Sequence, residues 1–411
     1  MGMLGMLWAA LKISGCDCCA KAQLLRNFSK HVFPSFIGDS HSIKLSDGRK
    51  EFQIRMRRPD RTKLMSGFWQ HKLLSPSLWA LGLQNRRKSD AIIDGKALDD
   101  PRPPRNMSDS YCEVRLPFRT EPKLLEDYSS IYGGIRVGKL LEDLDVLAAS
   151  IAYLHCDDLD LTIVTAAVDR IDLLLPIDTI VSDVRLRGSV TYVGRSSIEV
   201  TLSVETDQSC AESWELAALA KFILVARSPS GDKSVEVNRL ELENQREQEI
   251  FAAGQERHQY RLRRSASSLF KMPPNEEEIK VVHDICMSHE LKPISDDLSS
   301  CRLQLIPMES TKRSSLKICH PQDRNIHNFI FGGYLCREAF ELAFATAYIF
   351  MGGKRPSLKT IDDIAFVHPV PIGSLVDFSS EIVHSRIHEG LLYACVQVVA
   401  DVIQPSSNNR L

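Results

Sequence analysis

The stretch HPQDRNIHNFIFGGYLCREAFELAFATAYIF, from His320 to Phe350, places a polar loop and a glycine pair directly before a long apolar segment. Apolar residues recur at helical spacing after Gly333, which predicts a helix that begins at the glycines. Glycine lets the backbone turn tightly and lets another group approach closely. The first turn of such a helix presents unpaired N–H groups and the positive end of the helix dipole. Together with the side-chain amide of Asn325, these donors are suited to polarise a carbonyl oxygen.

The same order of elements occurs a second time, nearer the N-terminus. A strand-like segment at 111–118 precedes Gly138, and an apolar helix pattern begins at that glycine. Strand patterns then follow each helix, at 161–175, 183–195, 196–205 and 216–227 in the first copy and at 358–370, 375–387 and 391–403 in the second. One helix followed by several strands, twice over, predicts two α+β units, each an antiparallel sheet wrapped around a central helix.

These patterns divide the 411 residues into four parts. The expected parts are an N-terminal extension at 1–106, a first unit at 107–228, a charged helical linker at 229–300 and a second unit at 301–411. The second unit carries three strand patterns where the first carries four, because a polar tail, QPSSNNRL, follows Ile403. The second unit is therefore expected to be truncated and to lack its last strand.

Composition and charge argue against several classes of function. The net charge of -2 gives no general case for nucleic-acid binding. Eleven cysteines, an odd number in a long chain, argue against a disulfide framework. Residues 1–106 carry 19 Lys and Arg against 9 Asp and Glu, a net charge of +10, so a basic leader precedes an acidic body. Its apolar start is shorter than the roughly 20 residues that span a bilayer, which favours an organellar transit peptide over a membrane segment.

The two predicted helices differ at one position of chemical interest. Asp145 stands seven residues beyond Gly138 on a face of apolar and small residues, where a carboxylate either points into a cleft or needs a partner. The equivalent position of the second helix, seven residues beyond Gly333, is Phe340. Conversely, the first unit has no counterpart of Asn325. Each half therefore has what the other lacks, although Asn325 fits the role of a loop-capping amide equally well.

Other candidate sites are weaker. The segment GGIRVGKL at 133–140 has the spacing of a phosphate-binding loop, but Leu140 stands where Ser or Thr should hold magnesium. Cys319 and Cys336 have no evident base partner, which argues against a thiol nucleophile. No set of four ligands predicts a metal site, because the cysteines at 16–19 lack a nearby fourth ligand.

Five motifs carry a resemblance to a known family, and they stand at 136–145 (RVGKLLEDLD), 165–173 (TAAVDRIDL), 188–200 (GSVTYVGRSSIEV), 320–343 (HPQDRNIHNFIFGGYLCREAFELA) and 362–375 (DDIAFVHPVPIGSL). With them the chain resembles the mitochondrial double-hotdog acyl-CoA thioesterases, numbered nine and ten in animals. The resemblance implies a tandem hotdog fold and hydrolysis of fatty acyl-CoA to free fatty acid and coenzyme A. It also implies a mitochondrial location, no cofactor besides the coenzyme A of the substrate, no integral membrane segment and a possible homo-oligomer.

The resemblance also implies roles for individual residues. In double-hotdog thioesterases an acid on one unit's helix faces an asparagine in the other unit's loop, which here pairs Asp145 with Asn325. Asp145 would be the general base for a water molecule or attack directly, Asn325 would orient the water or the carbonyl, and the Gly333 N–H would polarise that carbonyl. The residues expected at the substrate are Gly332, Gly138 and Arg136. The second interface, with Phe340 in place of an acid, is expected to be inert.

The missing strand bears on both fold and function. In the hotdog fold the last strand lies inside the sheet, so its absence leaves unpaired backbone groups on both neighbours. Part of the N-terminal region or a second chain would fill the gap, and the sequence favours neither. The alternative function is a catalytically impaired acyl-CoA-binding or regulatory subunit. A hotdog dehydratase fits less well, because His320 and Asp323 are poorly placed to form its acid–histidine pair.

Overall fold

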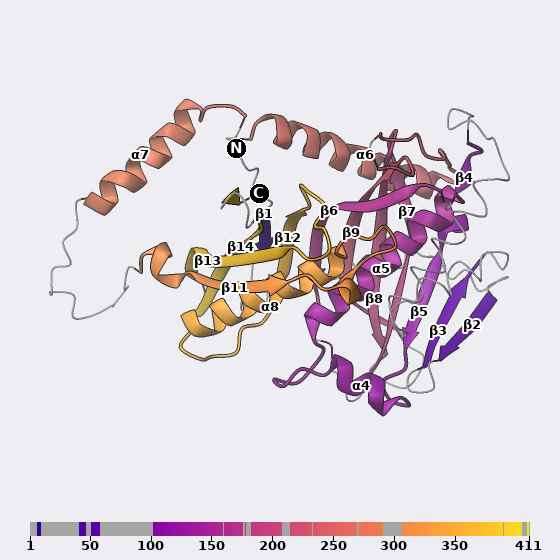
Figure 1. Ribbon diagram of the computed structural model, residues 1–411, viewed down its shortest axis with the longest axis horizontal. Helices are drawn as coiled ribbons and strands as arrows, with labels where there is room; N and C mark the ends of the chain where they lie inside the picture. The colour runs from indigo at the N-terminus through magenta and orange to yellow at the C-terminus, as the bar shows by residue number, and fades with distance from the viewer. Residues whose placement is uncertain are drawn as a thin grey trace.

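Two long helices, α5 (Val137–Cys156) and α8 (Gly332–Phe350), lie against one antiparallel sheet in the computed structural model (Figure 1). The structure describes residues 6–9, 41–46, 51–57, 102–158, 160–175, 177, 182–207, 214–231, 233–268, 271–290, 306–388, 390–404 and 409–410. Both helices carry apolar residues on more than one face, and a helix of that kind is stable where a sheet and a second helix cover it.

The first unit is complete. Its strands are β5 (Cys112–Leu116), β6 (Thr162–Leu173), β7 (Asp183–Val193), β8 (Ser197–Asp207) and β9 (Glu215–Arg227), in the spatial order β5-β7-β8-β9-β6. All neighbours are antiparallel, and α5 contacts β6, β7, β8 and β9. Sixteen of the α5 residues are buried, as the expected wrapped helix requires.

The second unit repeats this order around α8. Its strands are β11 (Arg313–Ile318), β12 (Thr360–Ala365), β13 (Leu375–His388) and β14 (Leu391–Gln404). β12 pairs with β6 of the first unit, for instance through Ile364 and Val168, so the two sheets are continuous. The predicted tandem hotdog fold is therefore confirmed, with the two helices packed against each other at the junction.

The position between β14 and β12, which the sequence leaves without a strand, is occupied. β1 (Met6–Ala9) lies there and pairs antiparallel with both neighbours. β15 (Asn409–Arg410) pairs with the other end of β14. Of the two ways of filling the gap that the sequence left open, the structure has the N-terminal one.

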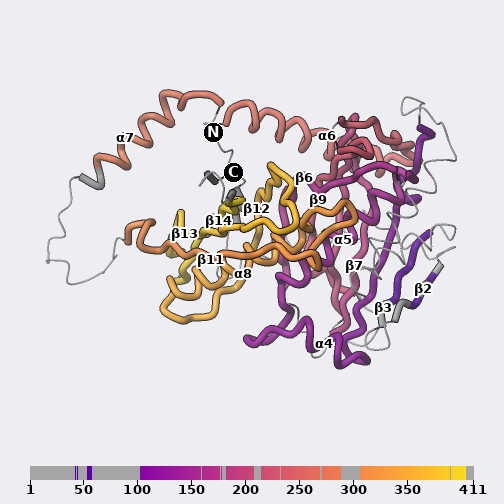
Figure 2. The backbone as a smooth tube through the Cα atoms, viewed as in Figure 1, coloured from indigo at the N-terminus to yellow at the C-terminus, as the bar shows by residue number. Residues whose placement is uncertain are grey.

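The remaining elements extend and brace the first unit. β3 (Glu51–Met56) adds to β5 and β2 (His41–Ser46) adds to β3, while β4 (Arg105–Asn106) pairs with β10 (Leu240–Glu241). The short helices are η2 (Met107–Ser110), α4 (Pro122–Tyr128), η3 (Met308–Thr311) and η4 (Pro321–Asp323). The chain passes from one unit to the other through α6 (Gln245–Ala266) and α7 (Glu276–Glu290), which Figure 2 traces along the top of the view.

The charged helix α6 packs on the sheet. Arg257 donates to the carboxylate of Glu199 on β8, at 2.6 Å and 3.1 Å, and Glu199 is almost fully buried. A Cβ atom on Gly254 would lie 2.4 Å from the Cβ of Tyr192, so the helix backbone touches β7. α6 therefore lies directly on the first unit's sheet, whereas the side chains of α7 through 287 are exposed.

His155, near the end of α5, predicts a pH dependence of stability. Its side chain is fully buried and Nε2 donates to the carbonyl of Asn238 at 2.8 Å. Burial lowers the pKa of His155 to about 4, whereas an exposed histidine in the unfolded chain titrates near 6.5. Below about pH 6.5 the His155 side chain binds a proton in the unfolded state but not in the folded state. The free energy of unfolding therefore falls as the pH drops toward 4.

The expected loss from His155 is about 3 kcal/mol between pH 7.5 and pH 4, from about 1.4 kcal/mol per pKa unit. Urea unfolding of the wild type and of His155→Gln at several pH values measures it. Gln can donate to the same carbonyl and does not titrate. Equal pH dependence in the two proteins would contradict the assignment.

Candidate active site

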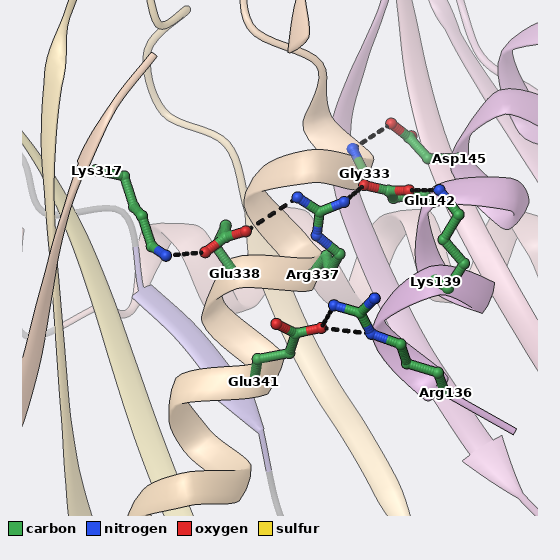
Figure 3. Close-up of polar contacts among 9 residues, drawn as sticks. All are labelled: Arg136, Lys139, Glu142, Asp145, Lys317, Gly333, Arg337, Glu338 and Glu341. Atoms are coloured by element: carbon green, nitrogen blue, oxygen red, sulfur yellow. Dashed lines mark hydrogen bonds and ion pairs between the residues drawn. The ribbon is translucent and has the colours of Figure 1, made fainter. Parts of the chain in front are cut away.

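Asp145 lies where the two units meet. Its Oδ2 accepts a hydrogen bond from the backbone N–H of Gly333 at 2.7 Å, across 188 residues of sequence (Figure 3). Its Oδ1 accepts from the hydroxyl of Thr165 on β6, at 2.7 Å. The carboxylate is almost fully buried. It also faces the first turn of α8, where the helix dipole favours a negative charge.

The glycine pair allows this close approach. A Cβ atom on Gly333 would lie 2.8 Å from the Cα of Glu142 and 3.2 Å from the Cβ of Asp145. A Cβ atom on Gly332 would lie 3.0 Å from Oδ2 of Asp145 and 3.4 Å from the ring of Phe366. The start of α8 therefore presses directly on the backbone of α5. A side chain at Gly333 would separate the N–H donor from the carboxylate.

Asn325 organises the loop in front of α8. Its Oδ1 accepts from the backbone N–H of His327 at 2.8 Å and of Phe329 at 3.2 Å, and its own N–H donates to the Phe329 carbonyl. Asn328 takes the left-handed φ of 62° that asparagine tolerates, which closes the turn. The loop-capping reading of Asn325 is therefore correct for Oδ1. Its Nδ2 group donates to no described residue, so a catalytic role for that group stays a prediction.

A chain of ion pairs holds the two helices in register. The Arg337 guanidinium on α8 bridges Glu142 of α5 and Glu338, which also binds Lys317 at 2.9 Å (Figure 3). Lys139 adds a second cation on Glu142 at 2.8 Å. Glu142 is buried, and removing the partner of a buried charge is strongly destabilising. These contacts fix the N-terminal half of α8 against α5, and with it the spacing between Asp145 and Gly333.

The other two predicted substrate contacts lie at the second interface. Arg136 donates to Oε1 of Glu341 at 2.6 Å and 3.0 Å, and both side chains are partly exposed. A Cβ atom on Gly138 would lie 2.8 Å from Cγ of Arg337. Gly138 thus approaches α8 as Gly333 approaches α5, but with Phe340 in place of the acid. The structure does not bring Arg136 and Gly138 into the contacts that join Asp145 and Gly333.

Sequence reasoning missed Thr165 and the Arg337–Glu142 pair. Thr165 is the first residue of the TAAVDRIDL motif, and its membership of that motif was the signal that could have found it. Glu142 lies near the start of its own helix, where an acid complements the helix dipole without any further partner. The structure adds a partner on the other unit, which no pattern within either helix indicates.

Cys319 and Cys336 are poorly suited to act as nucleophiles. Burial, and next the Asp145 carboxylate, raise the pKa of the Cys336 thiol well above its ordinary value. Burial raises the pKa of Cys319 to about 11. Both thiols are therefore protonated near neutral pH, and a protonated thiol is a poor nucleophile.

The chain is similar to two curated mouse proteins. It is 40% identical to acyl-coenzyme A thioesterase 9, mitochondrial, and 37% identical to acyl-coenzyme A thioesterase 10, mitochondrial, each over 315 residues that cover 75% of this chain and 70% of the relative. The chain belongs to the mitochondrial acyl-coenzyme A thioesterase 9/10 family. No protein-family model matches it. An acyl-CoA hydrolase from Staphylococcus aureus, solved with butyryl coenzyme A, is 24% identical with a TM-score of 0.34, over 46% of this chain and 99% of that one.

Two further observations describe the site's surroundings. Within the described ranges, no three His, Cys, Asp or Glu side chains are grouped so as to hold a metal ion. In the same part of the chain, no helix combines the length and apolar character needed to cross a membrane.

Thr165→Val tests whether the hydroxyl positions Asp145. A hydrogen bond to a charged group is worth about 1.5–3 kcal/mol, so we expect acyl-CoA hydrolysis to fall about ten- to a hundredfold in kcat. Thr165→Ser keeps the hydroxyl and should restore most of the rate. Steady-state kinetics on both variants measure this, and a wild-type kcat for Thr165→Val would contradict the role.

Proposed function

We propose that this chain hydrolyses fatty acyl-CoA to a free fatty acid and coenzyme A at the composite site between its two hotdog units. The observation that carries the proposal is the contact of 2.7 Å between the Asp145 carboxylate and the Gly333 N–H at the start of α8. It brings a potential base from one unit to a carbonyl-polarising donor from the other. A thioester substrate is supported by the mouse relatives, which are named acyl-coenzyme A thioesterases.

The reaction begins when the thioester carbonyl reaches the Gly333 N–H. The carbonyl oxygen replaces Oδ2 of Asp145 as the acceptor of that N–H, and the helix dipole adds to the polarisation. A backbone donor aimed at the developing oxyanion contributes about 10²–10³ in rate. The displaced Oδ2 is then free to accept a proton, while Thr165 still holds Oδ1.

Asp145 next acts as a general base on water. It removes a proton as the water oxygen attacks the carbonyl carbon. The carbon–sulfur bond of the tetrahedral intermediate then breaks, and Asp145 passes the proton to the leaving sulfur, which releases the free acid and coenzyme A and regenerates the carboxylate. A positioned base of this kind contributes about 10²–10⁴. We propose that the Nδ2 group of Asn325, whose Oδ1 is fixed by the loop, orients the water or the carbonyl.

The further assignments extend this proposal. Gly332 lies beside the carboxylate and Phe366, which supports a role next to the thioester. Arg136 and Gly138 at the second interface stay predictions for substrate contacts, with the partly exposed Arg136 guanidinium suited to a coenzyme A phosphate. The mitochondrial location follows from the names of the relatives and agrees with the basic leader. We also propose that no cofactor is needed and that the chain forms homo-oligomers.

A steady-state screen of short- to long-chain acyl-CoAs with the purified full chain tests the function. Released thiol reports turnover, and equilibrium binding of the same compounds is measured in parallel. Release of coenzyme A that depends on Asp145 supports hydrolysis. Saturable binding of acyl-CoA without thiol release would overturn it in favour of the binding or regulatory subunit.

A further inference from the structure

The position between β14 and β12, called here the fifth-strand lane, is filled differently from its counterpart in the first unit. There, β9 lies between β8 and β6 as a long strand antiparallel to both. In the second unit, β1 lies between β14 and β12 and is also antiparallel to both. A segment from the chain's N-terminal extension thus stands in the same topological place and orientation as a strand of the fold.

The register shows that β1 and β15 share this lane. β1 pairs Met6 with Val399 and Ala9 with Val396. β15 pairs Asn409 with Gln404 and Arg410 with Ile403. Both run in the same direction along β14, and β13 pairs along the other side of β14 over the same residues. β15 therefore lies beside the C-terminal end of β14, and β1 lies farther along the same side of β14, toward its N-terminal end.

An empty lane would be costly at this place. Val396 and Val398 of β14 are fully buried, as are Ile361 and Ile364 of β12. Backbone N–H and C=O groups in such surroundings need partners, because an unpaired buried group loses its bonds to water without replacement. β1 supplies partners to β14 through four residues and to β12 through Leu7 and Ile364.

We propose that the second unit is completed by strand donation, with the β14–β12 lane as the acceptor and Met6–Ala9 of the same chain as the donated strand. The leader that reads as a transit peptide is then a folding element. Its removal would empty the lane. Main-chain pairing supplies the affinity, as in other complexes in which an extended segment adds a strand to a sheet.

The lane is linked to the candidate site through β12. β12 runs directly into Phe366, whose N–H donates to the carbonyl of Ala166 at 3.0 Å, next to Thr165. The Phe366 ring lies against Gly332, at 3.4 Å from the position of a Cβ there. Pairing that stabilises β12 therefore also stabilises the position of Phe366 beside Gly332. We expect loss of the donated strand to lower the hydrolysis rate as well as the local stability.

Amide hydrogen exchange on the full chain and on a chain lacking residues 1–10 is the primary test. We expect the lane-facing amides of Val396–Val399 and of β12 to exchange at least about tenfold faster in the shortened chain. The amides of β7 and β8 in the first unit are the internal control and should keep their protection. Because exchange is measured without substrate, it reports on strand donation even in a protein that hydrolyses nothing.

Two further variants cover the case in which the shortened chain fails to fold. Leu7→Pro in the otherwise full chain removes a backbone donor inside β1, and proline does not fit a central strand. Leu24→Pro makes the same change in the leader, outside β1, and is the matched control. A synthetic peptide of residues 1–12, added to the shortened chain, should restore protection in a saturable manner, and the same peptide with Leu7→Pro should not.

The outcomes decide as follows. Two results together support the donated strand. The first is faster exchange of the lane amides in Leu7→Pro and not in Leu24→Pro. The second is restored protection when the peptide of residues 1–12 is added to the shortened chain. Equal protection of Val396–Val399 with and without residues 1–10 overturns it, and concentration-dependent protection would then identify a second copy as the donor. Absence of thioester hydrolysis in the full chain overturns the proposed function alone and leaves this inference standing.

Discussion

Asp145→Asn is expected to lower kcat for acyl-CoA hydrolysis by about 10²–10⁴, with a small change in KM. The amide keeps the shape of the carboxylate and still accepts from the Gly333 N–H, but it cannot take a proton from water. The bonds to Gly333 and Thr165 lock the side chain in one orientation, so the loss reflects chemistry and not a displaced group. Steady-state kinetics with thiol detection measure it, and circular dichroism checks the fold.

The control for this change is Asp169→Asn on β6. Asp169 is also a partly buried carboxylate with a close partner, Arg261 of α6 at 2.6 Å. We expect its kcat to stay within about threefold of wild type. An ion pair of this kind contributes little to the free energy of unfolding, and this one joins Asp169 to α6 rather than to a proposed catalytic group. An Asp145→Asn protein that is folded and as active as Asp169→Asn would remove Asp145 from the mechanism.

Gly333→Ala is the second change with a large expected effect. The added Cβ would lie 2.8 Å from the Cα of Glu142, 2.6 Å from the ring of Phe331 and 3.2 Å from the Cβ of Asp145. The Glu142 contact is with backbone, so α8 must move away from α5. Overpacking of this kind costs about 1–3 kcal/mol of stability, and a displacement near 1 Å at a reacting centre costs about 10² in rate.

Gly254→Ala separates these two effects. Its Cβ would lie 2.4 Å from the Cβ of Tyr192, a comparable clash between α6 and β7 that leaves Asp145 and Gly333 untouched. We expect both variants to lose stability in urea unfolding and Gly333→Ala alone to lose activity per folded molecule. Equal kcat values in the two folded variants would show that the glycine is needed only for packing.

Several residues of the candidate site are predicted by the sequence alone. Asp145 and Asn325 were predicted because each unit lacks what the other has, and the glycine pair because a helix follows it directly. The structure places Asp145 against Gly333 and makes Asn325 the cap of its loop. The contacts of Thr165 and Arg337 were not predicted, because their partners, Asp145 and Glu142, lie on other elements and no local sequence pattern indicates such contacts.

Hydrophobic periodicity is a local property of the chain, and it predicts the repeated order of helix and strands in two α+β units. The resemblance to the thioesterase family implies that these units form a tandem hotdog fold. The sequence also showed that the second unit has one strand pattern fewer than the first. Which groups meet between the units, and which segment lies in the fifth-strand lane, depends on contacts between distant parts of the chain that the structure reveals. Met6–Ala9 carries little pattern of its own, and its place in the sheet depends on backbone pairing with β14 and β12, strands that begin more than 300 residues away.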